Sequence, residues 1–449
     1  MRRAWLLPIA VFVISLLFGA EPVKLPEPFR SLADLAAGAP PEVAADALLR
    51  IVESGKLADK NARKQLIEQA FLLGASAKFP VRMEGVPGTT SDTASGSLSD
   101  AYRLKLDALS LQSRAVENML PMDAPKAREL FGQMVKPSLA PLTCDDALVY
   151  EPSAFYQALG AVVNGAFTLQ EKAKEQHVNL LLEALAQVTS PSQLVPLADA
   201  IQAAAITATQ HQVLWARFNG LVENMQPDDR SFPVSLPALS VLSTPGIQAP
   251  FEKYRQKSHG CETDVAAASP NSSASAPAPK PTTPKLDRYW QSTNAQQLLQ
   301  AGKKLRFASS NQLLSDADRA TPEWQQQLAD YLNLIADWSQ DQEDSQAVYY
   351  HEKCLVYTAL LDLVAPGPQS DKILADYVDF VSNSDLYQQS PAEWLVEPHT
   401  LLDRSQSNSA RHAKILEAYQ NSGNPVLTLE VALEKAFNPR LPSPAVSSK

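Results

Sequence analysis

The sequence predicts an all-α protein of stacked antiparallel helical hairpins, with a second, smaller helical domain after them. Its composition is the first reason: glycine is scarce, at 16 of 449 residues. A many-turned β sandwich or a phosphate-cradling fold usually needs more glycine at positive φ. Ala, Leu, Gln and Glu, which are abundant here, lose little side-chain freedom in a helix. The second reason is periodicity, because apolar residues recur every three or four positions and no comparable run alternates in the manner of a strand.

The helical period is clearest in two stretches, one in each half of the chain. The first contains Leu98, Tyr102, Leu106, Leu109, Ser113, Val116 and Leu120. The second contains Trp324, Leu328, Tyr331, Ile335 and Trp338. In both, steps of three and four place the members on one face of a helix. Both stretches are therefore predicted to be helical.

Capping chemistry marks several helix starts. Three pairs have the spacing of a capping box, in which a Ser or Thr is followed three residues later by Glu or Gln. The pairs are Thr168 with Glu171, Ser190 with Gln193, and Ser390 with Glu393. Thr321 precedes Pro322, and proline is favoured at the first helical position. Proline, which totals 34 residues, thus largely punctuates helices.

A weak internal repeat favours stacking of the hairpins. The pattern Tyr156, Leu159, Gly160, Val163 recurs 38 residues later as Leu194, Leu197, Ala198, Ile201. Repeated helix pairs that cannot bury their apolar faces alone bury them against one another. We therefore expect the helices that carry these residues to be equivalent layers of one stack.

Residues 1–20 resemble a signal peptide. Arg2 and Arg3 precede a 15-residue apolar run, which Gly19 and Ala20 follow. The bulky Phe18 departs from a small-x-small cleavage site, so an uncleaved anchor and a buried N-terminal helix are alternatives. A cleaved signal peptide and an uncleaved anchor both place the rest of the chain outside the cytoplasm. We expect a periplasmic, cell-envelope or secreted protein with no stable membrane span once the signal is removed.

Composition also indicates the domain boundaries. In the segment 262–285, 18 of 24 residues are Ala, Pro, Ser or Thr, so it is predicted to be a disordered linker. It separates a helical-hairpin domain at 21–261 from a second helical domain at 286–437. A Pro/Ser-containing tail, also predicted to be disordered, follows at 438–449.

The chain has three cysteines, and in an oxidising compartment two of them can pair. Cys144 and Cys261 lie in turn-rich stretches and are predicted to form a disulfide. Cys354 shares a helical face with Tyr350 and Tyr357, so it is predicted to be a buried small hydrophobe.

Motifs for common chemistry are missing from the sequence. It contains no Gly-x-Gly-x-x-Gly, no phosphate-binding Gly-x-x-x-x-Gly-Lys-Ser/Thr loop and no Gly-x-Ser-x-Gly elbow. His351 and Glu352 begin a zinc-protease pattern, but Leu355 replaces its second histidine, and His351 with Cys354 is too small a ligand set. We interpret His351 as an exposed residue beside a core cysteine. No catalytic, cofactor-binding or metal-binding residue is predicted.

These observations favour a non-enzymatic scaffold or interaction module that binds a protein or peptide. Removal of residues 1–20 leaves 37 basic against 49 acidic residues, and this excess of acid argues against nucleic acid as a partner. One alternative is an envelope hydrolase acting on glycan or peptide, because catalytic groups can come together from separated helices. A second is a carrier of a small apolar ligand.

Overall fold

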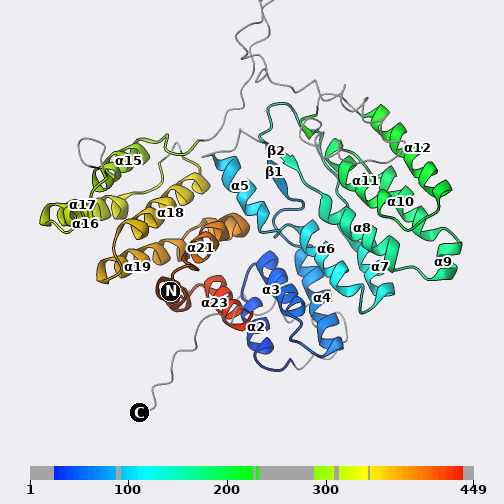
Figure 1. Ribbon diagram of the computed structural model, residues 1–449, viewed down its shortest axis with the longest axis horizontal. Helices are drawn as coiled ribbons and strands as arrows, with labels where there is room; N and C mark the ends of the chain where they lie inside the picture. The colour runs from blue at the N-terminus through cyan, green and yellow to red at the C-terminus, as the bar shows by residue number, and fades with distance from the viewer. Residues whose placement is uncertain are drawn as a thin grey trace, which may run out of the picture. The chain divides into compact units, whose positions relative to one another are not determined.

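The computed structural model describes residues 25–86, 93–225, 229–231, 288–307, 313–341 and 344–437 (Figure 1). This part of the chain is all-α, as predicted, with one small two-stranded sheet formed by β1 (Met83–Gly85) and β2 (Leu148–Tyr150). None of its helices is both long and apolar enough to span a bilayer. The predicted signal peptide, linker and tail lie outside the described residues, and so does Cys261.

The helices belong to two compact units, each assembled from segments far apart in the sequence. The described residues of unit 1 lie within 25–83, 105–231 and 425–437, and those of unit 2 within 84–104 and 288–424. The helices of unit 1 are α2 (Phe29–Ala36), α3 (Pro41–Glu53), α4 (Lys60–Gly74), α6 (Ala108–Met119), α7 (Ala124–Gln133), α8 (Ser153–Gly165), α9 (Leu169–Ala173), α10 (Gln176–Ala186), the 3₁₀ turn η1 (Pro191–Gln193), α11 (Leu194–Gln202), α12 (Ala208–Asn224) and α23 (Pro425–Phe437). Those of unit 2 are α5 (Ala94–Arg103), α15 (Thr293–Arg306), α16 (Asp316–Arg319), α17 (Pro322–Asp337), α18 (Gln346–Leu363), α19 (Pro368–Ser382), α20 (Leu386–Gln389), α21 (Pro391–Ser405) and α22 (Ser409–Asn421).

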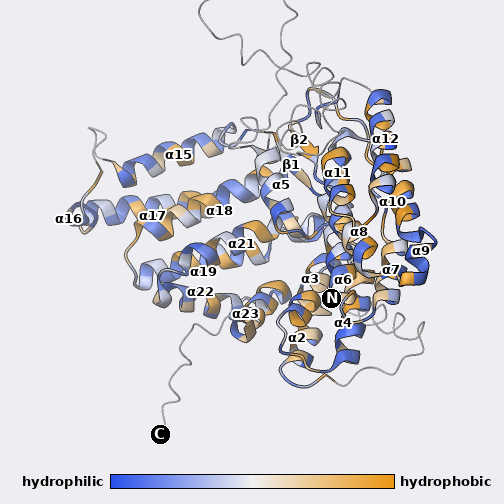
Figure 2. Ribbon diagram, turned by 45° about the vertical axis from the view of Figure 1, so that its right-hand side comes forward, coloured by the Kyte–Doolittle hydropathy of each residue, from blue (hydrophilic) through white to orange (hydrophobic). Residues whose placement is uncertain are grey.

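Unit 1 is a stack of helices that pack mainly against near neighbours in the chain. Helix α3 packs on α4, α4 on α6, α6 on α8, and α8 on α11. The two helices that carry the predicted repeat, α8 and α11, are therefore in contact, and both are largely hydrophobic (orange in Figure 2). Gly74 allows α4 and α6 to approach closely, because a Cβ at this position would lie 2.9 Å from the Cβ of Leu111.

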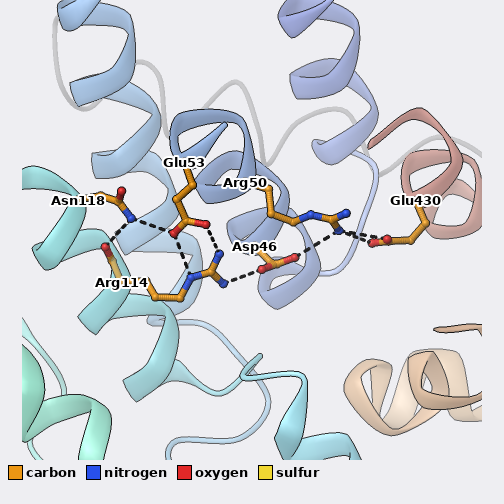
Figure 3. A network of polar contacts seen from close by, with 6 residues as sticks. All are labelled: Asp46, Arg50, Glu53, Arg114, Asn118 and Glu430. Carbon is orange, nitrogen blue, oxygen red and sulfur yellow. Dashed lines mark hydrogen bonds and ion pairs between the residues drawn. The ribbon is translucent and has the colours of Figure 1, made fainter. Parts of the chain in front are cut away.

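The C-terminal helix α23 completes unit 1 beside its first helices, since it packs on α2. A network of polar side chains joins α3, α6 and α23 (Figure 3). Arg50 binds Glu430 at 3.1 Å, and Arg114 binds Asp46 at 2.6 Å and Glu53 at 2.8 Å. The network thus connects helices that are more than 300 residues apart in the sequence.

Unit 2 is built around α18 and α21. Helix α18 packs on α19 and α21, and α21 also packs on α22 and α5, while α15 pairs with α17. The largest fully buried side chains of this unit are aromatic, namely Trp394, Tyr350, Tyr377 and Tyr419. Three of them, Tyr350, Trp394 and Tyr419, donate to backbone carbonyls, as in Tyr350 Oη to Trp394 O at 2.8 Å. Such a bond is the usual way to bury these rings.

Most predicted helix starts are confirmed. Thr168 and Ser190 form complete capping boxes with Glu171 and Gln193, and Thr321 caps α17 by accepting from the N–H of Trp324.

The stretch from Leu98 to Leu120, with its helical period, forms two helices and not one. Helix α5 ends at Arg103 and α6 begins at Ala108. Lys105 takes a left-handed φ of 57° between them, and the Asp107 side chain accepts from the N–H of Ser110 at 3.0 Å. Aspartate is a strong N-cap, so a new helix starts inside the apolar pattern.

Candidate functional site

A buried polar cluster in unit 2 has the most catalytic appearance of any group in the described chain. His351 on α18 bonds the Ser97 hydroxyl of α5 through Nε2, and its Nδ1 lies 2.9 Å from Oε1 of Glu397 on α21. Glu393 lies one turn earlier on α21, with Oε1 at 3.9 Å from Nε2. We call these four residues the His351 cluster. His351 is only 1% exposed, so the prediction of an exposed histidine is wrong.

The local sequence explains why the carboxylates converge. Glu393 and Glu397 are four residues apart on α21, which places both on one face of the helix. The predicted capping box at Ser390 and Glu393 is wrong, because the Ser390 side chain makes no cap bond. A buried imidazolium without a counter-charge would be costly. The Glu393 carboxylate faces the His351 ring and not the N-terminus of α21.

The order serine, histidine, glutamate is that of a hydrolytic triad, but the protonation state differs. Burial lowers the pKa of His351, but the attraction of the Glu393 and Glu397 carboxylates outweighs burial and raises that pKa to about 9. At neutral pH the ring is therefore an imidazolium, which donates to Ser97 and has no lone pair to accept its proton. Ser97 is itself buried, and the Tyr289 ring stacks on His351. The cluster is best suited to hold α5 against α18 and α21.

The cysteines differ in their surroundings. Cys354 is free and fully buried, as predicted. Cys144 is not a free thiol. Its predicted partner, Cys261, lies outside the described residues, so the pairing stays a prediction. Among the described residues, no group of three His, Cys, Asp or Glu side chains is placed to hold a metal ion.

Unit 2 also carries a groove of about 570 Å³ between α17, α18 and α19. One stripe of α18, spaced by four residues, contributes Tyr349, Lys353 and Tyr357 to its lining. Leu332 and Ala336 of α17 line one wall. The opposite wall is formed by residues of α19 that include Lys372, Asp376 and Phe380. We call this the Lys353 groove.

Lys353 is enclosed by aromatic rings. Its ammonium donates to Trp338 O at 2.8 Å and to the Tyr349 hydroxyl at 3.0 Å, and it lies 5.0 Å from the centre of the Phe380 ring. Trp338 O belongs to the C-terminal end of α17, where a cation is favoured by the helix dipole. Burial opposes the charge and lowers the pKa of Lys353 to about 8. This side chain is both a helix cap and a desolvated amine at the edge of a cavity.

A second groove in unit 2, of about 560 Å³, has an apolar floor and a charged rim. Trp324, Leu361, Leu374 and Ile415, all buried, form the floor. The rim carries both signs of charge in the residues Asp316, Arg319, Asp362, Asp371, Arg411 and Lys414. Several of these are paired, such as Arg411 with Asp362 at 3.0 Å and Lys414 with Asp371 at 2.5 Å. We call this the Arg411 groove.

Sequence reasoning identified neither groove. The signal for Lys353 was available, because Tyr349, Lys353 and Tyr357 share one helical face next to the predicted core stripe of Tyr350 and Cys354. A lysine between two tyrosines on a face adjoining the core is a candidate for an amine enclosed by aromatic rings. Ser97 gave no signal at all, because its partner on α18 is 254 residues away.

No protein-family model matches the chain, and neither the curated proteins nor the solved structures contain one that is significantly similar to it. The fold and the three sites above therefore define the protein only as an all-α chain of stacked helical hairpins. Its function has to be argued from its own residues.

Proposed function

We propose that the protein is a non-catalytic interaction module outside the cytoplasm, and that its Arg411 groove binds an extended peptide segment of a partner protein. The observation that carries the proposal is the form of the groove, in which buried apolar side chains lie beneath a rim of paired acidic and basic groups. Apolar floors supply affinity by removing partner side chains from water. Rim charges of both signs supply orientation and selectivity.

The hydrolase alternative has less support. In the cluster with the triad order, the histidine is a cation at neutral pH, the serine is buried and Tyr289 stacks on the histidine ring. Extracytoplasmic location rests on the N-terminal sequence pattern of residues 1–20. A short peptide fits the Arg411 groove better than a small apolar ligand does, because charged groups surround its apolar floor.

Two alanines of α22 give a matched pair of variants for a test. Ala410 lines the Arg411 groove, whereas Ala413 is exposed on the same helix and does not line it. A photo-crosslinking amino acid at Gln369, which also lines the groove, reports the occupant in living cells of the native host. We expect one dominant protein adduct, which Ala410→Trp reduces at least tenfold, since an indole fills the groove. Ala413→Trp leaves it unchanged.

Two results would contradict peptide binding in the Arg411 groove. Adduct yields that do not differ between the two tryptophan variants, or that never exceed the background without irradiation, would show that the Arg411 groove is not the binding site. Circular dichroism of both variants establishes that the helical fold is intact.

A further inference from the structure

We propose that the Lys353 groove is a binding site for small carbonyl compounds, aldehydes or ketones, which Lys353 holds covalently as a Schiff base. The site shares no lining residue with the Arg411 groove. The proposal is therefore independent of peptide binding there.

The position of the amine is the first argument. Lys353 comes from the middle of α18 and lines a cavity of about 570 Å³, although the residue as a whole is 6% exposed. Two hydrogen bonds, to Trp338 O and the Tyr349 hydroxyl, fix Nζ in place. When the amine is neutral, these bonds use its two N–H groups and the nitrogen lone pair remains for a bond to carbon. A lysine desolvated among apolar and aromatic groups is the usual form of a Schiff-base lysine.

The walls of the groove suit an uncharged carbonyl compound. Tyr349, Tyr357 and Phe380 present aromatic surface next to Lys353, and Leu332 and Ala336 add aliphatic surface on α17. Besides Lys353, the charged lining residues are one base, Lys372, and three acids, Asp376, Asp379 and Asp385, so the lining does not favour an anion. An aromatic or short aliphatic aldehyde thus has apolar partners for its body and an amine for its carbonyl carbon.

Formation of the Schiff base needs only the Lys353 amine and the carbonyl compound. The Nζ lone pair forms a bond to the carbonyl carbon, and the carbonyl oxygen takes up a proton to give a carbinolamine. This intermediate loses water as the C=N bond forms, so amine and carbonyl compound give imine and water, with no change of oxidation state. Asp376 lines the same groove, and burial raises the pKa of its carboxyl, which suits it to deliver the proton to the departing hydroxyl.

The experiment uses the full chain, benzaldehyde as the probe and cyanoborohydride as the reductant that traps the imine. Peptide mass spectrometry then measures benzyl adduct at each lysine. A lysine with a pKa of about 8 is roughly a quarter neutral at pH 7.5, against about 0.1% for an ordinary lysine. Some of this advantage is lost because a weaker base is a weaker nucleophile. We expect Lys353 to be labelled at least tenfold faster than the exposed Lys372 of the same groove.

Two comparisons of labelling rate test whether Lys353 forms the Schiff base in this groove. Asp376→Asn should slow labelling of Lys353 several-fold while labelling of Lys303 and Lys304, which lie on α15 away from the groove, is unchanged. Labelling of Lys353 that is no faster than that of Lys372 on folded protein would overturn the proposal and leave Lys353 as a helix cap. Lys353→Arg keeps a cation at the end of α17 and identifies any adduct formed elsewhere.

Discussion

His351 and Cys354 show which properties of a side chain its sequence neighbours predict and which they do not. The sequence analysis interprets His351 as an exposed residue beside the core Cys354, yet partners on α5 and α21 cover it. The partners of His351 come from three distant segments, namely α5, α21 and the residues before α15, and no local sequence pattern specifies them. Cys354, in contrast, was predicted correctly, because its burial depends only on the helical face that it shares with Tyr350 and Tyr357. Local periodicity predicts burial, whereas polar partnership depends on the tertiary fold.

The charge of His351 is testable at the residue scale. Its pKa of about 9 in the folded state exceeds the ordinary value of 6.5, so the folded protein binds the proton more tightly than the unfolded chain. The stabilisation is fully present below about pH 6.5 and is lost as pH rises to 9. A shift of this size corresponds to free energy on the order of 3 kcal/mol. The charged and titratable groups that contact the ring include Glu393 and Glu397 from α21, Tyr289 from the segment before α15 and Tyr350 from α18 itself.

NMR titration of the histidine ring protons measures this directly. We expect the His351 signal, assigned by its loss in His351→Gln, to titrate near pH 9. Lys353 has the opposite effect on stability, because its folded-state pKa is lowered to about 8 and deprotonation from there to about 10.5 favours the folded state. The NMR titration follows the His351 ring itself, so the effect of Lys353 on overall stability does not enter the measurement. A midpoint at or below 6.5 would contradict the account and restore a neutral histidine beside Ser97.

At the scale of elements, helix starts were more predictable than helix continuity. A capping residue acts on N–H groups within three positions, so Thr168, Ser190 and Thr321 were identified from sequence alone. The break between α5 and α6 was missed because the apolar period runs through it without a change of phase. Asp107 was the available signal, since a buried aspartate inside a helix is unfavourable whereas the same residue at an N-cap is stabilising.

The network on α3, α6 and α23 gives a prediction at this scale. Arg114 binds Glu53 through Nε and Nη2 and Asp46 through Nη1, with its side chain 23% exposed. Replacement by methionine removes the charge but keeps much of the apolar stem. Because the pairs form a bidentate, partly buried network, we expect Arg114→Met to lower the free energy of unfolding by about 1–2 kcal/mol.

Lys126→Met is the matched control, because Lys126 makes a single ion pair with Glu129 one turn along the same helix. We expect it to cost no more than about 0.5 kcal/mol. Urea denaturation followed by circular dichroism measures both. Equal losses for the two variants would mean that the network of Figure 3 contributes no more than an ordinary surface pair.

At the scale of the whole molecule, the fold class was predictable and the course of the chain through it was not. Scarce glycine and helical period suffice for an all-α prediction. Changes of composition, however, divide a chain only into contiguous stretches, whereas unit 1 includes α23 and unit 2 includes α5. Those assignments depend on Glu430 reaching Arg50 and on Ser97 reaching His351. The candidate site was likewise unpredictable, since both grooves are shaped by helices that only the tertiary fold brings together.

The central claim is that the protein works by binding rather than by turnover, and a phenotype assay in the native host tests it most directly. The assay compares single alanine replacements of all six histidines with Ala410→Trp and Ala413→Trp, with each variant checked for abundance and helical content. Binding energy is spread over a few central anchors, whereas loss of a general base typically costs 10²–10⁴-fold in rate. We expect folded histidine variants to retain function and Ala410→Trp alone to lose it. Loss of function in one folded, abundant histidine variant, with Ala410→Trp fully active, would contradict that expectation.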